Sequence, residues 1–196
     1  TTFNYYSTIY NMQKTLAIIL TIIASSQVYS QFIKEKSIDV SIGFGYSTPN
    51  EDIDITGQGF FMQGEYVLTL AKWIDLRPYT GLILTKDNPG NQPNDPLYKS
   101  TANAFLFGGK TRIAVPVPWV APYLEVGLGG SIGSFKTFTP STNIDYSGLL
   151  LHIPISIGLE LGPNHNFDIA FTYYFHNSVE QFVGAAAIGI SIPLSK

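Results

Sequence analysis

Three side chains in the C-terminal third of the chain have types and spacing suited to chemistry. His176 stands two positions before Ser178 in a His-Asn-Ser triplet, and His152 lies one predicted strand earlier. A histidine beside a serine can act as the general base for a nucleophilic hydroxyl. Two neighbouring imidazoles can instead bind a metal ion or respond to pH. Which chemistry applies depends on the elements that hold these side chains.

The stretch from Gly57 to Lys86 shows the pattern that organises the chain. In its first arm Phe60 and Met62 share one parity, while Gln63 and Glu65 share the other, and a second arm alternates in the same way after a short break. Alternation over more than ten residues per arm is long for a soluble strand and suits a tilted crossing of a bilayer. We interpret this stretch as one hairpin of a transmembrane β-barrel.

Eight stretches of the chain alternate, and the connections between them alternate in length. The stretches are residues 37–47, 57–70, 74–86, 101–115, 119–132, 147–161, 166–176 and 182–194. Short turns are predicted at 71–73, 117–118 and 163–165, and longer polar loops at Thr48–Thr56, Asp87–Ser100 and Gly133–Tyr146; the last connection, Asn177–Gln181, is short. An even strand number with short turns on one side is typical of outer-membrane barrels, whose turns and termini are periplasmic.

Side-chain volume and charge favour a membrane barrel over a soluble one. Eight strands enclose only enough space for side chains, and the apolar parity holds too many Leu, Ile and Phe residues to fit inside. The opposite parity is rich in Gly, Ala and Ser, which do fit. A soluble barrel would also need a charged exterior, whereas 13% of the residues are charged. Aromatic residues are expected at the two membrane interfaces: Tyr46, Phe60, Phe105, Tyr173, Phe175 and Phe182 on the external side, and Trp73, Trp119 and Phe167 on the periplasmic side.

Composition excludes several function classes. The formal net charge of −3 leaves no basic patch for nucleic-acid phosphates. Because the chain has no cysteine, disulfides, thiolate metal sites and cysteine nucleophiles are excluded.

The N-terminal segment has the features of a secretory signal. A short positive start at Lys14 precedes an apolar run from Leu16 to Ala24, which is well short of the roughly 20 residues that a membrane helix needs. We predict cleavage after Ser30. The predicted organisation is an upstream extension of the reading frame at residues 1–11, a signal peptide at 12–30 and an outer-membrane β-barrel domain at 31–196.

The polar parity carries charged side chains that are predicted to meet inside the barrel. They are Asp39, Glu65, Asp75, Arg77, Lys110, Arg112, Glu125, Glu160 and Asp168. A two-residue turn at 117–118 would place Lys110 opposite Glu125 and Arg112 opposite Tyr123. Buried charges must be paired to tolerate desolvation, so we predict a network that plugs the lumen. An ion path is the alternative, although eight strands rarely leave room for water.

The two histidines are predicted to face each other. A three-residue turn at 163–165 places His152 opposite His176 on the inner face, near the external mouth. The sequence provides no evident third metal ligand, so we expect ordinary hydrogen-bonded histidines, with no metal and no cofactor.

Glu51, Asp52 and Asp54 in the first loop lack the full spacing of a calcium loop and are expected to be solvated surface.

The alternating pattern as a whole resembles the outer-membrane β-barrel domain family, of the small eight-stranded OmpX/OmpA-like kind. The resemblance covers residues 31–196 and includes the closing segment GAAAIGISIPL. It implies an all-β, eight-stranded antiparallel up-and-down transmembrane β-barrel behind a signal peptide, in the outer membrane of a Gram-negative bacterium with a periplasmic N-terminus. Its partners would be outer-membrane lipid, the barrel-assembly machinery during biogenesis and a surface ligand at the external loops. The C-terminal Lys196 departs from the aromatic residue with which many such barrels end.

The triplet at His176 is also similar to the His-x-Ser of the outer-membrane lipid A 3-O-deacylases. In that family a downstream glutamate orients the histidine, whereas the only carboxylate that follows here is Glu180. His176 also has the inward parity, while an enzyme that acts on lipid needs a site facing the membrane. The expected function is therefore a structural or surface-interaction role in the cell envelope. A lipid-modifying hydrolase using His176 and Ser178, or a narrow channel, are the alternatives.

Overall fold

The structure is a computed structural model that describes residues 33–87, 98–176 and 178–195. The chain divides into Thr1–Lys34 and Glu35–Lys196, and all described strands belong to the second unit. The predicted upstream extension and signal peptide lie outside the described residues, as does most of the predicted loop Asp87–Ser100. Within the described ranges, no helix has the length and apolar character needed to cross a membrane.

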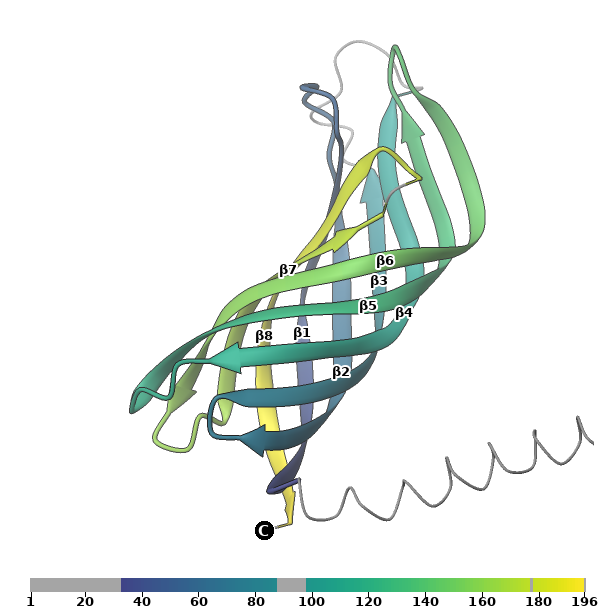
Figure 1. Ribbon diagram of the computed structural model, residues 1–196. Helices are drawn as coiled ribbons and strands as arrows, with labels where there is room; N and C mark the ends of the chain where they lie inside the picture. The colour runs from purple at the N-terminus through teal and green to yellow at the C-terminus, as the bar shows by residue number, and fades with distance from the viewer. Residues whose placement is uncertain (1–32, 88–97, 177, 196) are drawn as a thin grey trace, which may run out of the picture. The chain divides into compact units, whose positions relative to one another are not determined.

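The second unit is a closed antiparallel barrel of eight strands, which confirms the predicted fold class (Figure 1). The strands are β1 (Glu35–Pro49), β2 (Gly57–Ala71), β3 (Ile74–Asp87), β4 (Lys99–Ala114), β5 (Trp119–Phe138), β6 (Asn143–Gly162), β7 (Phe167–Phe175) and β8 (Gln181–Ser195). Each pairs with its sequence neighbours, and β8 closes the barrel on β1, with Ile188 opposite Ile42. We call the end with the β1–β2, β3–β4, β5–β6 and β7–β8 connections the loop end, and the opposite end the turn end.

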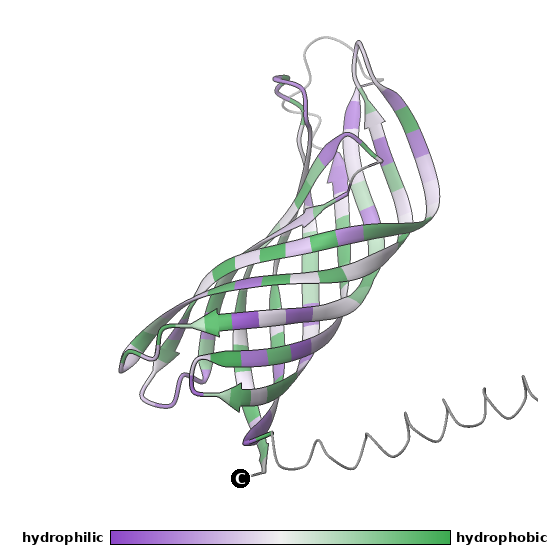
Figure 2. Cartoon of the chain, viewed as in Figure 1, coloured by the Kyte–Doolittle hydropathy of each residue, from purple (hydrophilic) through white to green (hydrophobic). Residues whose placement is uncertain are grey.

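The outward-facing side chains form an apolar belt. Hydrophobic and polar residues alternate along the strands (Figure 2), and the apolar member of each pair faces outward. Phe44, Leu128 and Leu151 are 79%, 72% and 81% exposed. A soluble protein rarely exposes an apolar patch of more than a few hundred Å². An apolar surface that continues around a closed barrel is the surface expected of a protein surrounded by lipid.

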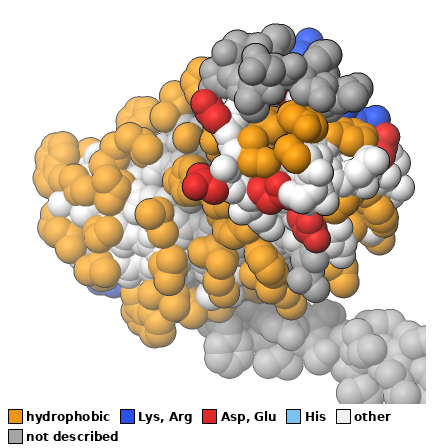
Figure 3. Space-filling view, turned by 90° about the horizontal axis from the view of Figure 1, so that it is seen from above, with side chains coloured by type: hydrophobic (Ala, Val, Ile, Leu, Met, Phe, Trp, Pro, Cys, Tyr) orange, Lys and Arg blue, Asp and Glu red, His pale blue; other side chains and the backbone are white. Residues whose placement is uncertain are grey.

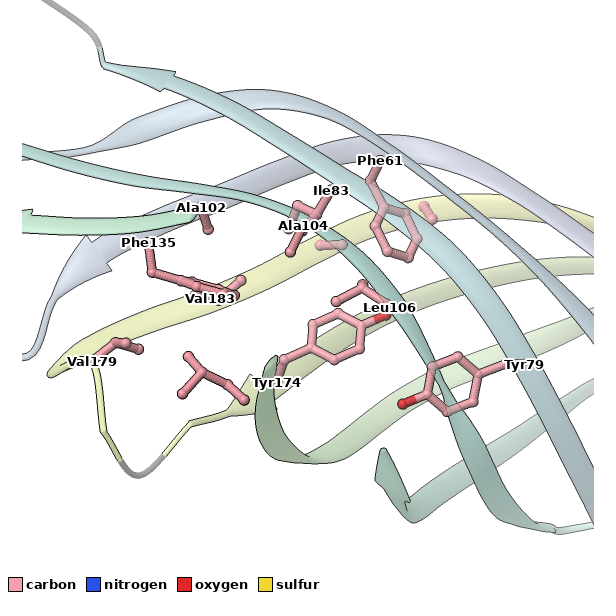
Figure 4. Packing of buried hydrophobic residues seen from close by; sticks show 13 residues of the cluster. Phe61, Tyr79, Ile83, Ala102, Ala104, Leu106, Phe135, Tyr174, Val179 and Val183 are labelled. Atoms are coloured by element: carbon pink, nitrogen blue, oxygen red, sulfur yellow. The ribbon is translucent and has the colours of Figure 1, made fainter. Parts of the chain in front are cut away.

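Large apolar side chains also fill the loop-end half of the interior, which the sequence analysis did not predict. Phe61, Ile83, Leu106 and Phe135 are 0–2% exposed and belong to one packed cluster (Figure 4). We call this cluster the apolar layer. Val179 and Val183 from the β7–β8 side complete it. The lumen is therefore packed like a protein core at this level.

The third predicted loop, Gly133–Tyr146, is wrong in extent. β5 continues to Phe138 and β6 begins at Asn143, so only residues 139–142 connect them. The strands remain paired along this hairpin, with Phe135 opposite Tyr146. Phe135 and Thr137 are buried on the inner side, which stabilises strands that the polar composition of the segment concealed.

The predicted register of the β4–β5 hairpin is also wrong. The structure places Arg112, rather than Lys110, opposite Glu125. The connection spans residues 115–118 instead of 117–118. Proline lacks an N–H group and cannot donate to the strand ladder. Pro116 and Pro118 therefore favour the wider turn, in which Trp119 adopts a positive φ of 70°.

Candidate functional site

Nine charged side chains meet in the turn-end half of the lumen, where we call them the charged layer. They are the nine polar-parity residues from which the sequence predicts a lumen network, Asp75 included. Arg77 lies at the centre of one half: its Nη1 donates to Asp39 Oδ2 at 2.6 Å and to Glu65 Oε2 at 2.9 Å. Lys110 Nζ connects the two halves, because it donates to Glu65 and to Glu125, each at 2.6 Å.

Arg112 organises the other half of the charged layer. Its Nε donates to Glu125 Oε1 at 2.7 Å, and its Nη1 donates to Glu160 at 2.7 Å and to Asp168 at 3.1 Å. The guanidinium also lies over the ring of Tyr123, 3.6 Å from its centroid. Tyr123 in turn donates to Asp168 Oδ1 at 3.0 Å. Gly158 allows this arrangement, since a Cβ atom there would lie 2.3 Å from the Tyr123 hydroxyl oxygen.

The charged layer holds six carboxylates and three cationic side chains. Buried ions need both a partner and further hydrogen bonds to offset their desolvation. Glu125 has two cationic partners, Lys110 and Arg112, and its side chain is 1% exposed. Four other carboxylates are more exposed, at 15–18%: Asp39, Asp75, Glu160 and Asp168. The excess negative charge of the layer therefore belongs to its partly exposed carboxylates, which water can solvate.

The lumen leaves very little free volume. The cavity beside the charged layer has a volume of about 20 Å³ and is lined by Gln63, Glu65 and Arg77, among others. A single water needs about 10–15 Å³ of such volume. The arrangement is that of a plug, with no room for a water-filled path at this level.

The two histidines lie between the charged layer and the apolar layer and share one hydroxyl group. Ser131 Oγ lies 2.7 Å from His152 Nδ1 and 2.8 Å from His176 Nε2. The remaining nitrogens are also occupied: His152 Nε2 by the Tyr79 hydroxyl, and His176 Nδ1 by the carbonyl of Tyr174 at 3.0 Å. The ring centroids of the two histidines are 5.4 Å apart.

For two neutral imidazoles, these partners determine where each proton lies. A carbonyl only accepts, so His176 Nδ1 donates to Tyr174 and its Nε2 accepts from Ser131. The single hydroxyl proton of Ser131 is then used, so Ser131 accepts from His152 Nδ1, and His152 Nε2 accepts from Tyr79. The result is a chain of hydrogen bonds with one direction, in which both histidines are neutral. We call these residues the histidine chain.

We expect Ser131→Ala to destabilise the barrel by about 1–3 kcal/mol for each of the two ring nitrogens that it leaves without a partner. Urea unfolding in phospholipid vesicles, followed by tryptophan fluorescence, measures the loss. Ser156→Ala is the matched control: Ser156 is equally buried and on the same inner face, but among the described residues its hydroxyl bonds only Thr172, at 2.9 Å. A loss no larger than that of Ser156→Ala would contradict the shared role of Ser131.

The candidate hydrolase residues are not assembled into a catalytic arrangement. Both ring nitrogens of His176 are taken by Ser131 and Tyr174, while Ser178 is exposed. The Glu180 carboxylate lies 3.1 Å from the Thr142 hydroxyl oxygen, and no hydrogen bond joins it to His176 within the described ranges. No group of three or more His, Asp or Glu residues that could hold a metal ion occurs in the part of the chain that the structure describes.

At the loop end, Glu51 joins the β1–β2 connection to the β5–β6 turn. Its carboxylate accepts from the hydroxyl groups of Thr142 at 2.6 Å, Ser141 at 2.7 Å and Thr139 at 3.0 Å. These hydrogen bonds, that from Thr142 first, lower the pKa of Glu51 below its usual value. The β7–β8 connection is held too, since Asn50 N donates to the carbonyl of Glu180 at 3.0 Å. Three connections therefore form one ordered surface.

A closed eight-stranded barrel with an apolar exterior and a packed, ion-paired lumen defines the chain as a small outer-membrane β-barrel by fold. Comparison with solved structures supports this class. Neisserial surface protein A (NspA) matches with a TM-score of 0.57 at 12% sequence identity, over 80% of this chain and 96% of that one.

Two further solved structures match with lower scores. They are the N-terminal β-barrel domain of Pseudomonas aeruginosa OprF (TM-score 0.46, 12% identity, 80% of this chain and 97% of that one) and the attachment invasion locus protein Ail of Yersinia pestis (TM-score 0.46, 18% identity, 81% and 98%). No family model and no curated protein sequence matches the chain. At such low identity the likeness shows the fold alone.

Proposed function

We propose that this chain is an outer-membrane β-barrel of a Gram-negative bacterium with a structural or surface-interaction role in the cell envelope. The turn end and both termini face the periplasm, and the loop end faces the outside. The filled lumen carries the proposal. The cavity beside the charged layer has room for about one water and the apolar layer is packed with buried side chains, which leaves no path for a solute at these two levels. The functional surfaces that we propose are therefore the lipid-facing belt and the loop end.

The ordered loop end supports the surface-interaction role. Binding to a preorganised surface avoids the entropy cost of ordering loops, and Glu51 holds two of the connections together. Seen from the loop end, acidic side chains surround an apolar group (Figure 3). Glu51, Asp52, Asp54 and Glu180 are the acidic residues of the β1–β2 and β7–β8 connections. An external partner would meet this acidic rim first. The barrel-assembly machinery would be a partner during biogenesis only.

The chain's lack of cysteine makes single-cysteine labelling on intact cells a direct test. Asp54 in the β1–β2 connection and Lys72 in the β2–β3 turn are both exposed, so each can be replaced by cysteine at the surface. We expect a membrane-impermeant maleimide to label Asp54→Cys on intact cells and Lys72→Cys only after the outer membrane is permeabilised. Labelling of Lys72→Cys on intact cells, with Asp54→Cys protected, would contradict the proposed orientation.

A further inference from the structure

Three lysines at the loop end face outward on adjacent strands. They are Lys86 on β3, Lys99 on β4 and Lys136 on β5. Lys136 is opposite Thr101. On the other side of β4, Leu84 is opposite Asn103. Continuing this register by one outward row places Lys86 beside Thr101. Lys86 and Lys136 therefore flank Thr101 in one row, with Lys99 next to Thr101 on the same face of β4. We call these three residues the lysine row.

The lysine row lies just beyond the apolar belt. On β4 and β5 the belt ends at Phe105 opposite Ile132, which are 48% and 51% exposed, and on β3 it reaches Leu84, one row further. On β4 and β5 one polar row, Asn103 opposite Ser134, separates the belt from the lysines. Two outward rows span about 13 Å along a strand, and less along the membrane normal because the strands tilt. Since a lysine stem can bend back along the surface, its ammonium group can lie at headgroup depth.

Nothing in the described part of the barrel neutralises the whole row. Lys136 Nζ pairs with Asp145 at 2.9 Å, but both side chains are exposed, by 36% and 49%, so the pair is weak. Lys99 lies 5.0 Å from the centroid of the Phe138 ring, a contact that orients its charge without cancelling it. Lys86 is exposed and has no ion-pair partner among the described residues.

The charged side chains at the loop end are distributed unevenly around the barrel. The acidic residues Glu51, Asp52, Asp54 and Glu180 belong to connections of β1, β2, β7 and β8. The lysine row lies on β3, β4 and β5, where the nearby acidic residues of the described loop end are Asp87 on β3 and Asp145 on β6. Figure 3 shows basic side chains at one edge of the loop end and several acidic ones away from that edge. With three lysines against two acidic residues on one side and four acidic residues on the other, an anionic group would favour the side of the lysine row.

We propose that the lysine row binds the phosphate groups of anionic lipids in the leaflet at the loop end. The inference rests on the proposed placement of the barrel in a membrane. Outward parity favours a lipid over a soluble ligand, because these side chains point away from the lumen and away from the acidic connections. A compact ammonium group pairs with phosphate as a point charge, and each lysine near a membrane surface strengthens attraction to anionic lipid.

Spin-labelled lipids in nanodiscs test the proposal. The full chain is reconstituted in phosphatidylcholine nanodiscs that carry either spin-labelled phosphatidic acid or spin-labelled phosphatidylcholine, and the motionally restricted fraction of each gives their relative association constants. We expect the wild-type chain to prefer phosphatidic acid. Replacing Lys86, Lys99 and Lys136 by glutamine should lower this preference by about fivefold for each lysine removed.

Two matched variants separate the charge from its position. Replacing the three lysines by arginine should preserve the preference, and Asp145→Asn should raise it because it releases Lys136. A preference that is unchanged by the three glutamines would overturn the inference while leaving the membrane placement intact. The inference would also be overturned if inorganic phosphate abolished the preference and chloride at equal ionic strength did not. That result would make the lysine row a site for soluble anions. A chain that restricts neither lipid would overturn the membrane placement itself.

Discussion

Glu125→Gln is expected to lower the free energy of unfolding by about 3–5 kcal/mol, the cost of breaking a buried ion pair by removing one partner. Glu125 is 1% exposed, and it accepts from Lys110 at 2.6 Å and from Arg112 at 2.7 Å. The amide keeps the shape of the side chain and loses its charge. It leaves Lys110 with Glu65 alone in a site from which water is largely excluded.

Urea unfolding in phospholipid vesicles measures this loss through the fluorescence of Trp73 and Trp119. Asp145→Asn is the control, because it breaks the exposed pair with Lys136 and should change stability by less than about 1 kcal/mol. If Glu125→Gln were as mild as Asp145→Asn, the charged layer would not be a closely packed buried network.

Phe61→Ala should destabilise the barrel by about 3–5 kcal/mol, because it opens a cavity in the apolar layer. Phe61 is 2% exposed, and its ring centroid lies 6.3 Å from that of Tyr174. Tyr174 donates to Gln63 at 2.7 Å, so the apolar layer also fixes a hydrogen bond of the polar interior. Loss of the ring would loosen both.

The neighbouring residue provides a matched control for Phe61. Phe60 has the same side chain on the same strand but faces outward and is 40% exposed. Phe60→Ala leaves no internal cavity, and lipid can fill the space, so its effect on the same urea transition should be clearly smaller. Equal losses for the two variants would contradict the packed apolar layer and would indicate an interior that collapses or hydrates freely.

The sequence predicts much of the architecture because alternation and loop length follow directly from the barrel geometry. All eight strands were predicted, and the structure confirms their existence and the closed antiparallel order. It also brings Glu65 and Arg77, two members of the predicted lumen network on one hairpin, within 2.9 Å, and it places His152 beside His176 as predicted. These pairs were accessible because short turns determine which residues of a hairpin lie opposite each other.

Other features depend on partners that are distant in the sequence. Phe61 and Leu106 have the inward parity, but the Gly-, Ala- and Ser-rich average of that parity concealed the apolar layer. Ser131 is one of several inward serines, and no local pattern indicates that it bonds two histidines from β6 and the end of β7. Glu51 was interpreted as solvated surface because its three hydroxyl partners are contributed by the β5–β6 turn.

An ion pair between long side chains does not determine which residues of two strands lie opposite each other. Lys110 and Glu125 were predicted to be partners, and they are 2.6 Å apart although they are not opposite each other. The register depends instead on Pro116 and Pro118. Because proline cannot donate to the strand ladder, these residues widen the turn to 115–118 and the paired residues begin further from its centre. A prediction from ion pairing alone could not have distinguished the two registers.

Planar-bilayer recording of the folded, reconstituted chain tests the filled lumen most directly. The cavity beside the charged layer has room for about one water, and the apolar layer above it is packed with buried side chains. We therefore expect no conductance steps from protein whose gel mobility before and after boiling shows that it is folded. Reproducible single-channel steps from that protein would contradict the plugged barrel and would favour a channel.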